Sequence, residues 1–128
     1  MEKNDIWRKK KVCIIDDDQD ICEIYLMKFR LEGFDVAVAT NGEEGLKMIR
    51  ETEPDVILLD IEMPVMNGIE VLAALRKDPV CGKIPVIMLT NQDNEGAYKE
   101  VGQFNTRFYI IKSLATPQKV VDLVREVL

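Results

Sequence analysis

Residues 55–68 read DVILLDIEMPVMNG, an unbroken apolar run that ends in an acid and is followed by a loop containing proline and glycine. A strand that is apolar on both faces is tolerated only in the middle of a parallel sheet, where helices cover both of its sides. The stretch therefore predicts a central strand over residues 55–59, with Asp60 at its carboxyl end and a loop from Pro64 to Gly68.

Four further apolar, β-branched runs indicate strands, over residues 11–16, 34–39, 84–89 and 108–111. Amphipathic stretches between them predict helices over residues 19–32, 41–52, 69–75 and 94–104, with a last helix that runs from a Thr116 cap and Pro117 to Val127. Strands that alternate with helices in this way predict an α/β fold, a doubly wound five-stranded parallel sheet with helices on both faces.

Single residues predict where several helices begin and end. Gly33 is expected to terminate the first helix, and Asn41 is expected to cap the second. The helix over residues 94–104 is the least favoured by propensity, because Gly96 and Gly102 each cost about 1 kcal/mol relative to alanine. Asn105 is a suitable left-handed residue to end it.

Length and charge restrict the class of protein. The 128 residues, 47% of them hydrophobic, predict one globular unit over residues 11–128 behind a short tail over residues 1–10. The formal charge of -6 argues against binding to nucleic acid or to an anionic membrane. No apolar run approaches the roughly 20 residues that cross a bilayer, so we expect a cytoplasmic protein whose partners are proteins or a cation.

Cysteine and histidine usage excludes several kinds of site. Cys13, Cys22 and Cys81 are an odd number without metal-ligand spacing, which predicts reduced, structural thiols. The chain has no histidine, so it lacks the usual base of a serine or cysteine hydrolase. Any phosphohistidine chemistry would need a second protein.

Polar residues follow four of the predicted strands, at the sheet edge where ligands of open parallel sheets bind. They are Asp16-Asp17-Asp18, Asp60, Thr90-Asn91 and Lys112. Singly these have structural explanations, such as an acidic helix N-terminus or a solvated lysine. If they meet, two carboxylates about 4 Å apart repel by roughly 4 kcal/mol. The net charge of the pocket would be -3 + 1 = -2, from three ionised aspartates (Asp16, Asp17 and Asp60) and the protonated Lys112. One divalent cation would neutralise that charge, and Mg²⁺ or Mn²⁺ suits carboxylate ligands.

The motifs CIIDDD, DVILLDIEMPVMNG, PVIMLT and YIIK, in this order and spacing, resemble the receiver domain of bacterial two-component response regulators. The resemblance covers Lys11 to Leu128 and implies the flavodoxin-like strand order 2-1-3-4-5. It implies that Asp60 is the phosphoacceptor, that Asp16 and Asp17 hold Mg²⁺ with Asp60 and the backbone carbonyl of Glu62, and that Thr90 and Lys112 contact the phosphoryl oxygens.

The resemblance also implies partners and a switch. The phosphoryl donor would be a phosphohistidine on a sensor histidine kinase or a histidine phosphotransfer protein, and the chain would catalyse its own phosphorylation without belonging to a turnover enzyme class. Thr90 and Tyr109 would form the switch, and the helix over 94–104, the strand over 108–111 and the last helix would meet an output protein or a second, phosphorylated copy.

The chain departs from the family pattern at a few positions. Ser113 follows Lys112 where the family has proline, often with a cis peptide, which costs about 2.5 to 4 kcal/mol for a residue such as serine; the loop after the last strand is therefore expected to differ. Asn91 follows Thr90 where a small residue is usual. Asn91 would either bond a phosphoryl oxygen or narrow the donor's entry. Glu62 and Gln92 stand where family members control the lifetime of the phosphoryl group. The stretch 102–108 lacks the family's Gly-Ala pair before the last strand, so the end of the helix over 94–104, and with it the output surface, is the part of the structure that the sequence determines least.

Three functions fit these residues. A stand-alone receiver would relay a signal from phosphorylated Asp60 through protein contacts. A receiver-like interaction module would bind its partners without phosphorylation, as Asn91 and Ser113 could favour. A phosphatase with an aspartyl-phosphate intermediate would use an acid two residues after its nucleophile, and Glu62 has that spacing from Asp60.

Overall fold

The described residues form one sheet of five parallel strands in the order β2-β1-β3-β4-β5, which confirms the predicted order. In this computed structural model, residues 8–91 and 95–128 are described. The part of the predicted tail up to residue 7, and Gln92, lie outside them. The strands are β1 Lys11–Ile15, β2 Asp35–Ala39, β3 Val56–Asp60, β4 Val86–Thr90 and β5 Phe108–Ile111.

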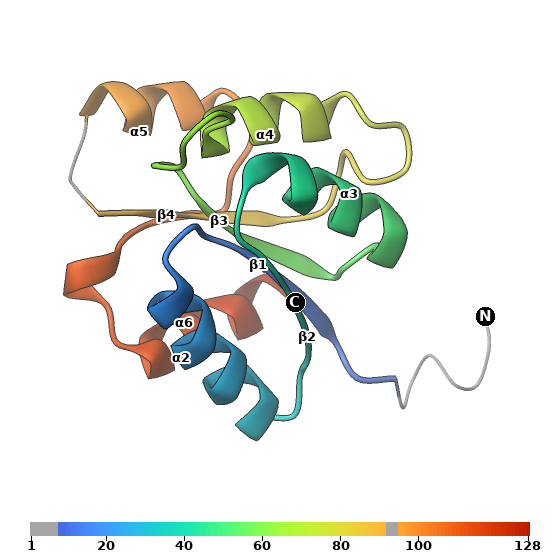
Figure 1. The fold of residues 1–128 in the computed structure, drawn as a ribbon, viewed down its shortest axis with the longest axis vertical. Helices are drawn as coiled ribbons and strands as arrows, with labels where there is room; N and C mark the ends of the chain where they lie inside the picture. Colours follow the sequence, from blue (N-terminus) through green and yellow to red (C-terminus); the bar gives the residue numbers. More distant parts are fainter. Residues whose placement is uncertain (1–7, 92–94) are drawn as a thin grey trace.

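Helices cover both faces of this sheet, as predicted (Figure 1). On one face lie α2 Gln19–Leu31 and α6 Pro117–Val127, and on the other lie α3 Gly42–Thr52, α4 Gly68–Arg76 and α5 Glu95–Gly102. Alternate residues of each strand point to opposite faces. Ile57 and Leu59 therefore pack in the core under α3, α4 and α5, whereas Leu58 packs in the core under α2 and α6.

β3 is buried along its whole length, which confirms that the apolar run quoted first lies in the middle of the sheet. It pairs with β1 on one side and with β4 on the other, and in the β3–β4 register Asp60 stands beside Leu89. The side chain of Asp60 thus stands at the end of a strand that is buried along its whole length.

The predicted local signals for helix ends are confirmed. Gly33 has a φ of 92°, which few other residues tolerate. Asn41 Oδ1 accepts a hydrogen bond from the Glu44 amide at 2.8 Å, and Thr116 Oγ1 accepts one from the Lys119 amide at 3.1 Å. Pro117 occupies the first position of α6, where its missing N–H costs nothing.

α5 is shorter than predicted, ending at Gly102 instead of residue 104. Asn105 adopts the expected left-handed backbone, with a φ of 58°. The Arg76 side chain of α4 binds this turn, because its Nε donates to the Phe104 carbonyl at 2.7 Å and its Nη2 to the Asn105 carbonyl at 3.3 Å. Elsewhere the observed bounds agree with the predicted ones or differ by at most two residues, as helix and strand ends commonly do.

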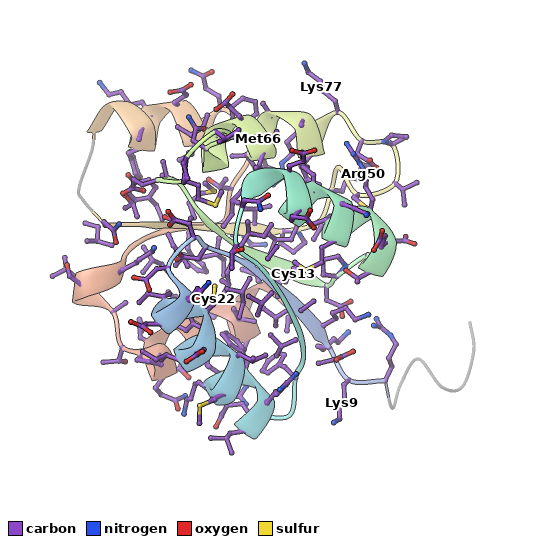
Figure 2. The ribbon with its side chains drawn as sticks, in the orientation of Figure 1. Lys9, Cys13, Cys22, Arg50, Met66 and Lys77 are labelled. Carbon is purple, nitrogen blue, oxygen red and sulfur yellow. The ribbon has the colours of Figure 1, made fainter. Side chains whose placement is uncertain are left out.

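The three cysteines are buried and unpaired, which confirms the prediction of structural thiols. Cys13 lies on β1 and Cys22 on α2 (Figure 2). Burial, followed by the nearby charge of Asp16, raises the pKa of Cys22 to about 11, so its thiol stays protonated. No helix in the part of the chain that the structure describes is long and apolar enough to span a bilayer.

Candidate acidic site at the carboxyl edge of the sheet

Four strands bring the predicted site residues to one edge of the sheet. Asp16 directly follows β1, Asp60 and Thr90 are the last residues of β3 and β4, and Lys112 directly follows β5. Asp16, Asp60 and Thr90 are exposed by 2% or less, and among the described residues they are the ones that are both polar and buried. Such groups are costly to bury unless they have partners or a function.

Lys112 joins two of the acids. Its Nζ lies 2.6 Å from Asp16 Oδ2 and 3.3 Å from Asp60 Oδ1. Burial alone would lower the pKa of Lys112, but the hydrogen bond that Lys112 donates to Asp16 and the charges of Asp60 and Asp16 outweigh it, so the pKa is raised. The Lys112 ammonium therefore stays protonated between the side chains of Asp16 and Asp60.

Asp60 is only partly satisfied by the protein. Its Oδ1 accepts a hydrogen bond from the Glu62 amide at 3.2 Å as well as facing Lys112. Its Oδ2 is buried and has no hydrogen-bond partner. Burial, followed by the charge of Asp16, raises the pKa of Asp60 to about 8. This carboxyl group therefore holds its proton to a higher pH than an ordinary aspartate does, and added positive charge would favour its ionised form.

The acids fit a divalent cation. Asp16, Asp17 and Asp60 each offer a carboxylate oxygen, and these oxygens lie within 4.8 Å of one another. Asp17 is exposed while the other two are buried, so the cluster opens to solvent on one side. The free Oδ2 of Asp60 is an oxygen that a hard cation would bind. The backbone amide of Glu62 donates a hydrogen bond to Asp60 Oδ1. That the backbone carbonyl of Glu62 is a further metal ligand stays a prediction.

The Glu62 side chain makes a contact that the sequence did not reveal. Its Oε1 accepts hydrogen bonds from Thr90 Oγ1 at 2.5 Å and from the Asn91 amide at 2.7 Å. The second oxygen, Oε2, is buried without a hydrogen-bond partner. The sequence predicts a role for the side chain of Asn91, which is exposed. The structure instead shows its backbone N–H as a donor in the site. In the sequence, the one sign of this contact was that Glu62 stands two residues after Asp60.

The loop after β5 begins at the site lysine. Lys112–Leu114 forms one 3-10 turn, η1, in which Ser113 is exposed. The described peptide bonds are all trans, including the one that precedes Ser113. Lys112 is the first residue of this turn, and its side chain reaches Asp16 and Asp60.

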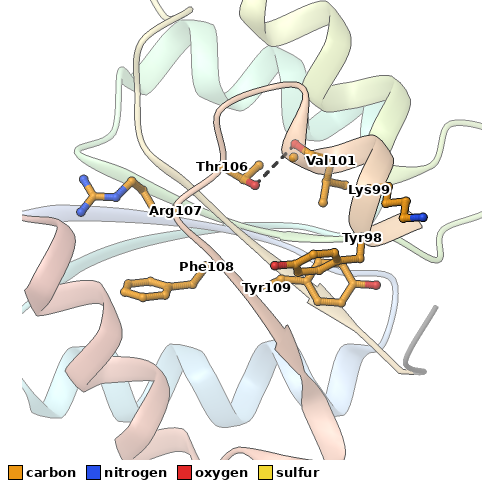
Figure 3. A pocket seen from close by; sticks show the side chains of 8 residues that line it. Tyr98, Lys99, Val101, Thr106, Arg107, Phe108 and Tyr109 are labelled. Carbon is orange, nitrogen blue, oxygen red and sulfur yellow. Dashed lines mark hydrogen bonds between the residues drawn. The ribbon is translucent and has the colours of Figure 1, made fainter. Parts of the chain in front are cut away.

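Tyr109, predicted as part of the switch, lies on β5 beside a small cavity (Figure 3). The cavity has a volume of about 220 Å³ and is formed by α5, β5 and the loop between them. The ring of Tyr109 meets that of Tyr98 edge to face, with centroids 5.2 Å apart and an interplanar angle of 82°. The structure thus sets Tyr109 against α5.

Comparison of the sequence with known proteins identifies relatives of this chain. The family model of the response regulator receiver domain matches residues 12–125. The DNA-binding response regulator MtrA of Mycolicibacterium smegmatis is 40% identical over 82 residues, which are 64% of this chain and 35% of MtrA. The chain therefore spans about a third of the length of the curated relatives it matches.

Solved structures share the fold over nearly the whole chain. The chemotaxis protein CheY4 of Vibrio cholerae superposes with a TM-score of 0.88 at 26% identity, covering 94% of this chain and 100% of that one. The receiver domain of the Francisella response regulator 1452 gives a TM-score of 0.84 at 31% identity, covering 93% and 96%.

Proposed function

The chain belongs to the response regulator receiver family, and on that premise we propose that it accepts a phosphoryl group on Asp60. Membership of the family implies that the donor is a phosphohistidine of a sensor histidine kinase or a histidine phosphotransfer protein, which agrees with the absence of histidine from this sequence. The observation that carries the proposal is Asp60 itself, buried at the end of β3 with Lys112 at one oxygen and no hydrogen-bond partner at the other.

In the transfer, a carboxylate oxygen of Asp60 attacks phosphorus. The bond between phosphorus and the donor's nitrogen breaks, and its electron pair leaves with the histidine. Such a transfer depends mainly on position and on stabilisation of charge. Lys112 supplies a fixed positive charge 3.3 Å from Asp60 Oδ1, and Thr90 supplies a neutral hydroxyl donor to a phosphoryl oxygen.

The residues that would hold Mg²⁺ are Asp16, Asp17 and Asp60, with the carbonyl of Glu62 as a further ligand. When bound, Mg²⁺ supplies positive charge that neutralises the carboxylates and the phosphoryl oxygens. The raised pKa of Asp60 supports this assignment, because added positive charge beside the carboxyl group would favour the ionised form that attacks phosphorus. Mn²⁺ suits the same ligands.

The signal then passes through protein contacts of the phosphorylated domain. Thr90 and Tyr109 form the proposed switch, with α5, β5 and α6 as the output surface. Phosphorylation biases an equilibrium between two arrangements of this surface. A nucleic-acid partner is not proposed for this chain, given its charge of -6, and its cytoplasmic location stays a prediction.

Incubation with a small acyl phosphate and Mg²⁺, followed by intact mass spectrometry, tests the proposal. We expect the mass of one phosphoryl group on wild type and none on Asp60→Ala. Asp122→Asn, a change of an exposed acid on α6, serves as the control that keeps the adduct. No adduct on wild type under any donor condition would support the phosphorylation-independent interaction module, and multiple turnover on a phosphomonoester would support the phosphatase.

A further inference from the structure

An anionic oxygen already lies where Thr90 is expected to meet the phosphoryl group. Glu62 Oε1 accepts the Thr90 hydroxyl at 2.5 Å and the Asn91 amide at 2.7 Å. Two donors from the end of β4 thus converge on one carboxylate oxygen, the arrangement that a phosphoryl oxygen would also require. The contact joins the loop after β3 to the end of β4, two residues beyond the phosphoacceptor.

We propose that the Glu62 carboxylate is an internal competitor of the phosphoryl group. It occupies Thr90 and the Asn91 amide in the unphosphorylated domain, and it has to leave before these groups can bind a phosphoryl oxygen on Asp60. The inference rests on the proposed function of Asp60 and adds a positioning residue to it.

Thr90 and the Asn91 amide cannot donate to Glu62 and to a phosphoryl oxygen at the same time. A threonine hydroxyl carries one hydrogen and a backbone amide carries one hydrogen. Both hydrogens are directed at Glu62 Oε1, so neither is available to a phosphoryl oxygen while that contact persists. Charge acts in the same direction, because the carboxylate and the phosphoryl group are both anionic and repel at short range.

The competitor is held in a way that allows it to be displaced. Its hydrogen bonds are strengthened by the negative charge of the acceptor. Its other oxygen, Oε2, is buried without a hydrogen-bond partner, which costs the hydration of that oxygen. The residue as a whole is half-buried and lies beside the exposed Asn91, so the carboxylate can rotate into water and regain hydration. The opposing effects leave a contact that a phosphoryl group can replace.

The competition predicts that removing the carboxylate speeds phosphorylation. We expect Glu62→Ala to accept the phosphoryl group from a small acyl phosphate with Mg²⁺ about tenfold faster than wild type, the factor expected when charge-assisted hydrogen bonds no longer have to be broken. Glu62→Gln should be intermediate, because its neutral amide oxygen still accepts but more weakly. Glu51→Gln, which removes the charge of an exposed glutamate on α3, should match wild type.

Two readouts separate this contact from a general effect of charge. The rates are compared again at about 1 M salt, where the interaction between separated exposed charges is screened over roughly 3 Å. The Asn91 amide resonance is followed by NMR in the unphosphorylated protein. We expect the rate ratio to survive salt, and we expect the amide to move upfield in Glu62→Ala and, less, in Glu62→Gln.

The outcomes distinguish the inference from the function on which it rests. Two results would overturn the competition and leave the phosphoacceptor role of Asp60 intact. In the first, wild type is phosphorylated but Glu62→Ala is phosphorylated no faster than wild type at high salt. In the second, the Asn91 amide resonance does not move in Glu62→Ala. Absence of an adduct from wild type and from every variant would overturn the proposed function and the competition together.

Discussion

The backbone carbonyl of Asp60 lies directly against Gly68, so closely that a Cβ added at residue 68 would overlap the carbonyl oxygen. The Gly68 amide also donates to the Ile61 carbonyl at 2.9 Å. Because α4 begins at Gly68, the start of this helix rests on the backbone of the proposed phosphoacceptor. The loop after β3 folds back on itself only because this residue has no side chain.

Gly68→Ala should therefore destabilise the domain strongly. The added Cβ meets backbone atoms of Asp60 and Ile61, which cannot move without displacing the end of β3. We expect the free energy of unfolding in urea to fall by about 3 kcal/mol or more, as for other forced overlaps in a packed interior.

Gly102→Ala is the matched control, because a Cβ at residue 102 would have nothing within 4 Å. Gly102 ends α5, where alanine is favoured over glycine by up to about 1 kcal/mol. An equal loss of stability in both variants would contradict the role of the close contact at Gly68.

Asp60→Asn should change how stability depends on pH in protein kept free of metal. The pKa of Asp60 is raised from 3.8 to about 8 in the folded state, so the folded state binds a proton that the unfolded state has lost between these values. Wild type should therefore lose stability as pH rises through this window, and Asp60→Asn should lack this loss.

At pH 9 we expect Asp60→Asn to exceed wild type by on the order of 2 kcal/mol in the free energy of unfolding, with little difference near pH 4. Urea titrations at both pH values in the presence of a chelator provide the measurement. Addition of Mg²⁺ should raise the stability of wild type at pH 9 more than that of the variant. A difference that grew toward low pH would contradict the assignment.

Lys112→Met should lower the free energy of unfolding, because it leaves the buried acids without their positive partner. Lys112 Nζ lies 2.6 Å from Asp16 Oδ2, and the Asp16 side chain is fully buried. Removing one partner of a buried ion pair costs about 3 kcal/mol, because the other charge stays buried. We expect a loss of this size in chemical denaturation at pH 7, and a fall in the rate of phosphorylation of about 100-fold or more.

Lys47→Met, a change of an exposed lysine on α3, should have little effect on either quantity. Adding Asp16→Asn to Lys112→Met should recover part of the lost stability, since the uncompensated charge is then removed. Strictly additive effects of the two substitutions would show that the pair does not interact.

Val65→Asn should stabilise the domain. Val65 has a φ of 69° in a tight turn that the Met66 amide closes on the Pro64 carbonyl at 2.7 Å. A β-branched residue is strained in this left-handed region, whereas asparagine tolerates it. The Val65 side chain is 99% exposed, so the substitution removes no packing. We expect a gain of about 1 kcal/mol in the free energy of unfolding.

Val80→Asn provides the comparison, because Val80 is also exposed, at 69%, and does not have a positive φ. Its effect on stability should lie within about 0.5 kcal/mol of zero. If both variants gained stability equally, the cause would be the replacement of an exposed apolar side chain by a polar one and not relief of backbone strain at Val65.

The sequence by itself determined the order of the elements and the edge at which the site forms. The apolar run before Asp60 required a strand covered on both faces, and parallel strands bring their carboxyl ends to one edge. Asp16, Asp60, Thr90 and Lys112 therefore had to meet once the alternation of strands and helices was known. Gly33, Asn41 and Pro117 fixed helix ends through local backbone geometry, which needs no tertiary contact.

Only the tertiary structure decided which atoms face one another at that edge. The contact of the Glu62 carboxylate with Thr90 and the Asn91 amide depends on a side-chain rotamer and on the spacing of two loops that are 28 residues apart. The overlap avoided at Gly68 depends on how closely α4 approaches the backbone of Asp60. Residue type and spacing along the chain fix the strand a residue follows, whereas ångström-scale contacts arise from the packing of distant segments, which no local pattern encodes.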